Sequence, residues 1–179
     1  FAMSSHIFDD FDRSEFSDAI FAVLGRALTI STRFDASTKV LARLSPLKSV
    51  ILIKSSLSEE DYDDLVSFIF EKFKNLNNAI NALGNNVDVK SVLTKARKSR
   101  NEFIHEATLG FNNGFDRIGD IELSLLIERI KYLVLNIIRG DILISTIISM
   151  QSKEPISDYI FSEKYEYEYL NWVMERFEK

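Results

Sequence analysis

Apolar residues recur at steps of three and four along most of this chain, and a pattern with that period allows little besides α-helices. A sheet of many short strands is disfavoured, because the 179 residues include only 6 Gly and 2 Pro for turns. The pattern therefore predicts an all-α fold. Its clearest run comprises Phe16, Ile20, Val23, Ala27, Ile30, Phe34, Leu41 and Leu44.

Helix start and stop signals divide the chain into four to five long helices. The first is expected to begin at Ser14 and to end at Ser45-Pro46. Residues 47–56 fit either a short extended piece or a helical or turn connector, which we favour. The second helix is expected to follow Ser58, a residue type that caps helices, and to end before Gly84.

Three further helices are expected over about residues 88–109, about 120–152 and from about 157 to the C-terminus, with a loop at 110–119. Short connections between long amphipathic helices favour antiparallel neighbours, and hence an up-and-down bundle. We expect residues 14–179 to form a single domain and residues 1–13 to lie outside it. Phe1-Ala2, which precede Met3, resemble a cloning remnant.

Composition narrows the classes of function. The chain has no Cys and only two His, and no spacing of residues suggests a metal site, so we expect neither a metal nor a cofactor. No signal-peptide pattern is visible, and charged residues interrupt the most apolar region, residues 123–150. We therefore expect a soluble, cytoplasmic protein without a membrane span. The formal net charge of −5 means that any binding of nucleic acid must be local.

The third predicted helix carries the residues best suited to chemistry. On a helical wheel, Arg100 interrupts an apolar stripe that includes Leu93 and Phe103, and a charge there is costly unless it is paired or opens into a wet cleft. Asn101 and His105 are four residues apart and share one face. Arg100 and His105 diverge by roughly 140° on an ideal helix. They therefore serve one site only at a cleft edge, or when a second molecule completes the site.

The same helix is locally basic. Residues 87–101 contain five positive side chains and one Asp, a local charge of +4 that attracts a phosphate-bearing ligand. Lys95, Arg97 and Lys98 are our candidate RNA contacts within this run. A solvated helix face without a ligand explains the same run of charge, and this alternative stays open.

The segment Arg100-Asn101-x-x-x-His105 resembles the motif of the HEPN family, in which Arg is followed after four to six residues by His on a late helix of a helical bundle. Nearly the whole chain is compatible with that architecture, but only this hexad is specific. The resemblance implies a HEPN-like bundle and a metal-independent endoribonuclease, often a toxin or defence component. It also implies RNA as the substrate, a homodimer with paired motifs along a cleft, and an antitoxin or a nucleotidyltransferase-type protein as a further partner.

The residue types suit such a reaction. RNA cleavage can use the ribose 2′-hydroxyl as an internal nucleophile, which needs a base with a pKa near neutrality, and His is such a base. The resemblance implies that His105 is the base or acid and that Arg100 holds the phosphate through paired hydrogen bonds. It assigns Asn101 to orienting the site or bonding the substrate.

Other interpretations remain open from the sequence. In one of them, Arg100 simply pairs with a buried acid and His105 is an ordinary boundary histidine. The chain is then a non-catalytic HEPN module that binds a nucleotide, RNA or a partner protein, or a structural helical protein with an accidental motif. Glu106, beside His105, counts mildly against RNA binding. The aromatic residues of the last helix are expected to pack on the bundle or a partner rather than to stack on bases.

Overall fold

The computed structural model describes residues 14–84, 86–106 and 118–175. Within these ranges every regular element is helical and no strand occurs, which confirms the all-α prediction. The elements are α1 (Glu15–Leu52), η2 (Lys54–Ser56), α2 (Glu59–Lys72), α3 (Leu76–Ala82), α4 (Val87–Glu106), α5 (Asp120–Ser152), η4 (Asp158–Phe161) and α6 (Glu163–Met174).

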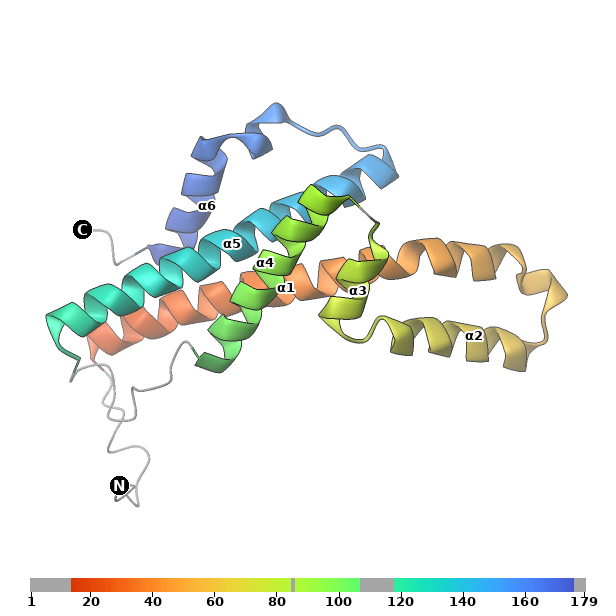
Figure 1. Cartoon of the computed structure of the whole chain (residues 1–179), viewed down its shortest axis with the longest axis horizontal. Coiled ribbons are helices and arrows are strands. Elements are labelled where there is room, and N and C mark those ends of the chain that lie inside the picture. Colours follow the sequence, from red (N-terminus) through yellow and green to blue (C-terminus); the bar gives the residue numbers. More distant parts are fainter. Residues whose placement is uncertain (1–13, 85, 107–117, 176–179) are drawn as a thin grey trace, which may run out of the picture.

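The body of the molecule is built on α1 and α5, which lie side by side and run in the same direction (Figure 1). α4 crosses both helices and runs the other way, and α6 packs on a different side of α5. The main hydrophobic core lies between these helices, because the apolar stripe of each one faces the others. Its fully buried side chains include Phe34, Leu93, Leu133, Ile137, Ile138 and Ile144.

The closest approach of the three large helices occurs at Gly140 of α5. A Cβ atom at this position would overlap the Cβ of Ala96 on α4 and would lie 2.9 Å from Cε2 of Phe34 on α1. Only a residue without a side chain fits there. The contact fixes α4 against α1, and it sets the positions of Arg100, one turn after Ala96, and of Asp35, next to Phe34.

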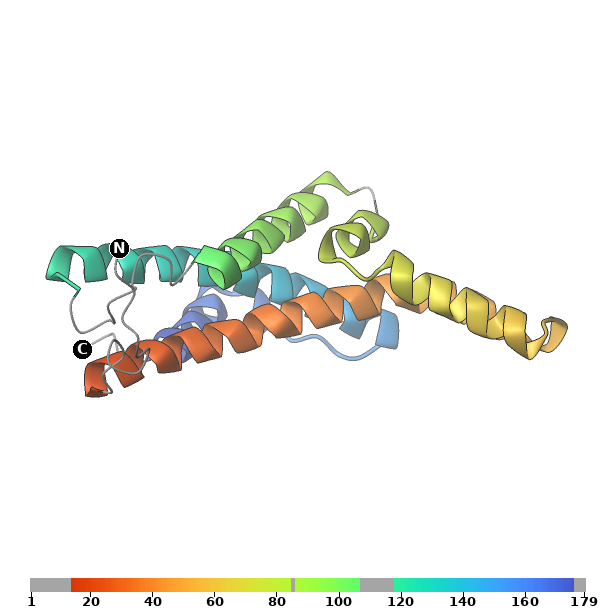
Figure 2. The ribbon, with the colours of Figure 1, turned by 90° about the horizontal axis from the view of Figure 1, so that it is seen from below.

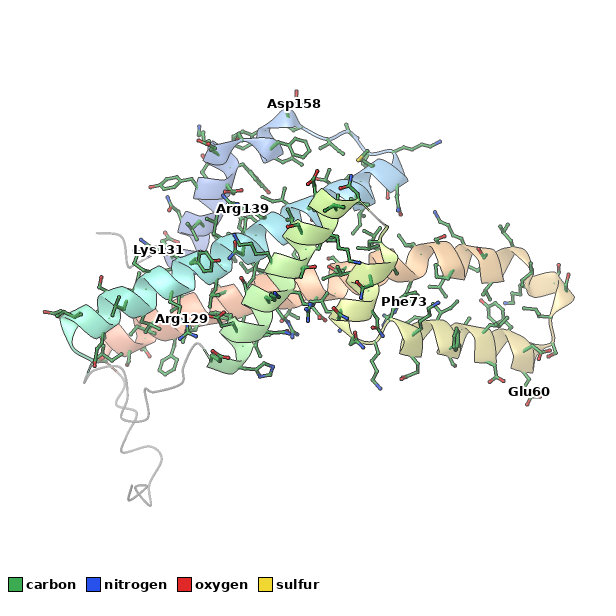
Figure 3. The ribbon with its side chains drawn as sticks, in the orientation of Figure 1. Glu60, Phe73, Arg129, Lys131, Arg139 and Asp158 are labelled. Carbon is green, nitrogen blue, oxygen red and sulfur yellow. The ribbon has the colours of Figure 1, made fainter. Side chains whose placement is uncertain are left out.

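An antiparallel arm, formed by the C-terminal part of α1 and by α2, projects from the body (Figure 2). Figure 3 shows Phe73 at the root of this arm and Glu60 near its tip. A second, smaller cluster of buried residues holds the arm together: Ala42, Val50, Ile69, Phe73 and Ala79.

The prediction that the first helix ends at Ser45-Pro46 is wrong, because α1 continues through Pro46 to Leu52. A proline inside a helix costs about 3 kcal/mol, since it has no N–H and its ring meets the carbonyl four residues earlier. Leu47 and Val50, beyond the proline, pack against α2 in the cluster of the arm, and this burial offsets the cost. The connector is therefore helical, as we favoured.

The second predicted helix is in fact two helices. Asn75 caps α3, because its Oδ1 accepts a hydrogen bond from the backbone N–H of Asn78 (2.8 Å). The amide of Asn78 donates to the carbonyl oxygen of Lys72 (3.2 Å), and Arg43 of α1 donates to that of Phe73 (3.1 Å). These side chains satisfy backbone groups that a helix break leaves unpaired.

Most other predicted boundaries are confirmed. Ser58 accepts a hydrogen bond from the backbone of Asp61 (3.1 Å), and Gly84 follows α3 with φ +115°, where a side chain would be strained. The last predicted helix begins later than expected: η4 occupies Asp158–Phe161, and Ser162 then caps α6. The predicted end of the third helix and most of the following loop lie at residues 107–117, outside the described residues.

α5 is long and apolar enough to cross a membrane, judged by length and composition alone. Half of the residues in its most apolar stretch are buried inside the protein, as in the core helix of many soluble domains. The expectation of no membrane span stays a prediction.

Candidate functional site

Arg100 lies on the edge of α4 that faces α1. Its side chain is 25% exposed, and its Nη2 lies 3.7 Å from Oδ1 of Asp35 on α1. Its Nη1 donates a hydrogen bond to Oδ1 of Asn101 (3.1 Å). The arginine that interrupts the apolar stripe is therefore paired with an acid from another helix.

Asp35 is shared by two cations. Lys39, one helical turn further along α1, places its Nζ 2.6 Å from Oδ2 of Asp35. The contact of Arg100 with Oδ1, at 3.7 Å, is too long for a hydrogen bond. The Nε of Arg100 is buried and has no hydrogen-bond partner among the described residues. Nη2 of the guanidinium, which forms no hydrogen bond with Asp35, keeps donors that another acceptor can use.

A cleft of about 640 Å³ opens beside Arg100, between α1, α4 and the start of α3. Its polar lining includes four cations and one carboxylate, a net formal charge of +3. Four asparagines, Asn101 and three at the start of α3, add neutral donors and acceptors. The cations are Lys39, Lys74, Arg97 and Arg100, and the carboxylate is Asp35.

His105 stands apart from this cleft. It lies in the last turn of α4, is exposed, and forms no hydrogen bond or ion pair with a described residue. It is not among the residues that line the cleft. Within one chain the structure therefore brings Arg100 and Asn101 together and leaves His105 on open surface.

Arg129 of α5 neutralises the acidic residues near His105. Its guanidinium lies 3.1 Å from Glu102 and 3.0 Å from Glu106, both on α4. Figure 3 labels Arg129 near the C-terminal end of α4. The charge of Glu106, which counted against RNA binding from the sequence, is thus partly compensated.

The three candidate RNA contacts lie on two surfaces. Arg97 lines the cleft with Arg100. Lys95 and Lys98 line a separate hollow of about 580 Å³ with Lys90, and Nζ of Lys95 lies 5.5 Å from the ring centroid of Tyr132. A ligand confined to the cleft would therefore contact Arg97 but neither Lys95 nor Lys98.

Sequence reasoning missed three charged residues of the cleft: Asp35, Lys39 and Lys74. Asp35 and Lys39 have the spacing of a helical ion pair, i to i+4, which was a usable signal. Lys74 comes next to the capping residue Asn75, and recognising that cap would have divided the second predicted helix. No local pattern shows that these residues meet Arg100.

The described residues hold no group of three or more His, Asp or Glu side chains placed to bind a metal ion. No family model, no curated protein and no solved structure matches this chain. The resemblance to HEPN proteins therefore depends on the hexad from Arg100 to His105, and function has to be argued from the cleft.

A second polar cluster surrounds Asp141 of α5, whose side chain is 1% exposed. Its Oδ2 accepts a hydrogen bond from the hydroxyl of Tyr169 (3.1 Å), and its Oδ1 lies 3.4 Å from Nε of Arg33. Burial raises the pKa of Asp141, although the charge of Arg33 and the hydrogen bond from Tyr169 oppose that shift. Burial and the nearby carboxylate also raise the pKa of Tyr169.

The raised pKa of Asp141 predicts a pH-dependent stability. The folded state binds this proton more tightly than the unfolded state, so the free energy of unfolding falls as the pH rises from about 4 through the raised pKa. Asp141→Asn cannot ionise and still offers an oxygen to Tyr169. We expect a shallower fall in urea-unfolding free energy over this range, whereas Asp63→Asn, an exposed control on α2, should keep the wild-type slope. A wild-type slope in Asp141→Asn contradicts the prediction.

Proposed function

We propose that this chain is a metal-independent endoribonuclease of HEPN type. The observation that supports the proposal best is the cleft of charge +3 beside Arg100 and Asn101, on a chain whose net charge is −5. Such a cleft attracts RNA phosphates locally, although the overall charge disfavours nucleic acid. The resemblance of the hexad to the family motif is the second support, and it assigns His105 to the reaction.

The proposed reaction begins when the ribose 2′-oxygen attacks the adjacent phosphorus. An imidazole accepts the 2′-hydroxyl proton and becomes an imidazolium, the bond from phosphorus to the 5′-oxygen breaks, and that oxygen takes up a proton from an imidazolium. His105 is the proposed proton-transfer group, and Arg100 donates to the non-bridging phosphate oxygens. Asn101, which accepts a hydrogen bond from Arg100, orients the guanidinium.

An RNase assay on the wild-type chain tests the proposal. We expect products with a 2′,3′-cyclic phosphate and a 5′-hydroxyl, and no cleavage of DNA, which lacks the nucleophile. Cleavage should persist in EDTA, because the proposed steps use protein side chains alone. Varied RNAs left intact by the wild-type chain would count against catalysis.

We further propose a homodimer whose two-fold axis lies near α4, because His105 lies outside the cleft of its own chain. α4 and α5 expose apolar side chains that such a contact would cover, among them Ile104 (37% exposed) and Leu125 (67%). Light scattering at micromolar concentration should give the mass of a dimer. Ile104→Asp should shift the mass toward the monomer, and a wild-type monomer would refute the assembly.

A non-catalytic module that binds a nucleotide, RNA or a partner protein is the second candidate. The separation of His105 from the cleft favours it, as do the apolar side chains on the arm, with Leu52 83% and Phe68 63% exposed. Wild-type chain that binds RNA without cutting it would establish this alternative.

Three further proposals depend on the family resemblance. They are a toxin or defence role, a cytoplasmic location, and an antitoxin or nucleotidyltransferase-type partner.

A further inference from the structure

Two of the four cations in the cleft, Arg97 and Lys74, do not form an ion pair with Asp35. Arg97 forms no ion pair with any described residue, although it lines the cleft. Lys74 pairs with Glu71 one turn earlier, at 3.3 Å, with the two side chains 74% and 72% exposed. Exposed pairs of this kind contribute little, so both cations are available to a ligand.

The break between α2 and α3 brings Lys74 to the cleft. The chain leaves the helix after Lys72 and resumes it at Leu76, and the hydrogen bonds of Asn75 and Asn78 hold this junction. Lys74 and Asn77 therefore line the cleft from the side of α3, while Arg97 and Arg100 line it from α4. Asn77 is exposed and makes no hydrogen bond with a described side chain.

We infer that Arg97 and Lys74 bind a second phosphate of the RNA strand, next to the phosphate that Arg100 holds. Arg97 and Arg100 are three residues apart on α4 and share one face, so the cations suit neighbouring phosphates of one chain. A cleft of about 640 Å³ has the size of a small-molecule site, which suits a few nucleotides of a single strand. The inference takes its ligand from the proposed function but does not require cleavage.

Binding of a short fluorescent single-stranded RNA to the full chain, followed by anisotropy, tests the inference. All measurements use the His105→Ala background, so that the probe stays intact. The added pair Lys74→Ala and Arg97→Ala should weaken binding at least about tenfold, since each removes a charge-assisted contact with phosphate. The slope of log affinity against log salt should become shallower by about 1.4, the value for two phosphates of a single strand.

The matched control removes Lys48 on the arm and Lys164 on α6, two exposed lysines that line neither the cleft nor the hollow on α4. It changes the net charge equally and should leave both affinity and salt slope near those of the background. An equal loss of RNA affinity in the two double variants would show that the effect comes from overall charge, and it would overturn the inference. So would unchanged binding by the Lys74 and Arg97 pair, or binding of ATP but not RNA in the cleft. A loss of RNA binding in the Lys74→Ala and Arg97→Ala variant supports the inference even when the wild-type chain does not cleave RNA. The test of this inference is therefore independent of the test of catalysis.

Discussion

The His105→Ala variant is expected to cleave RNA at least about a hundredfold more slowly than the wild-type chain, and Arg100→Ala should lose as much. The first change removes the proposed proton-transfer group, and the second removes the cation that stabilises charge on the phosphate; each such contribution has this scale. Single-turnover cleavage of an end-labelled RNA measures both. Asn101→Ala should lose less, because Asn101 orients the site without transferring a proton.

The structure supplies controls for these rates. His105 is exposed and forms no hydrogen bond or ion pair with a described residue, so His105→Ala should unfold at the wild-type temperature. Arg100→Ala leaves Asp35 with Lys39 alone, and Arg100→Lys is therefore added, which keeps the charge but lacks the planar fork. Lys48→Ala, an exposed change on the arm, should cut like the wild type. A His105→Ala chain that cuts as fast as the wild type would move the conclusion to the binding module.

Gly140→Ala is expected to lower the free energy of unfolding by at least about 2 kcal/mol, within the range for overpacked cores. An added methyl group at Gly140 overlaps the Cβ of Ala96, which has no rotamer to change, and crowds the ring of Phe34. α5 would have to move away from α4 and α1. For a chain of this size the loss corresponds to a midpoint lower by about 4–8 °C in thermal unfolding.

Gly25→Ala is the matched control for this prediction. Gly25 is an exposed residue of α1, and a Cβ there would meet nothing within 4 Å. Because alanine is the better helix former, this variant should gain about 0.5–1 kcal/mol. Gly140→Ala as stable as the wild type would show that the three helices are not in close contact at this point.

Local patterns predicted the helices well where the pattern and the caps agreed. α5 begins and ends where its apolar period and the flanking residues place it, and Ser58 caps α2 as expected. Two predictions failed because long-range packing outweighed a local signal. Pro46 stays inside α1 because the next turns bury Val50 against α2, and Asn75 divides a continuous apolar period because α3 packs across α1.

The sequence by itself determined the all-α class, most helix boundaries and the presence of a basic α4 that carries Arg100, Asn101 and His105. These features depend on the helical period and on residues close in the chain, where local hydrogen bonds and side-chain spacing decide. Only the tertiary structure decided that Arg100 meets Asp35, 65 positions earlier, and that Lys74 lines the same cleft. Those meetings follow from the close packing of α1, α4 and α5 at Gly140, a contact between distant segments that no local period encodes.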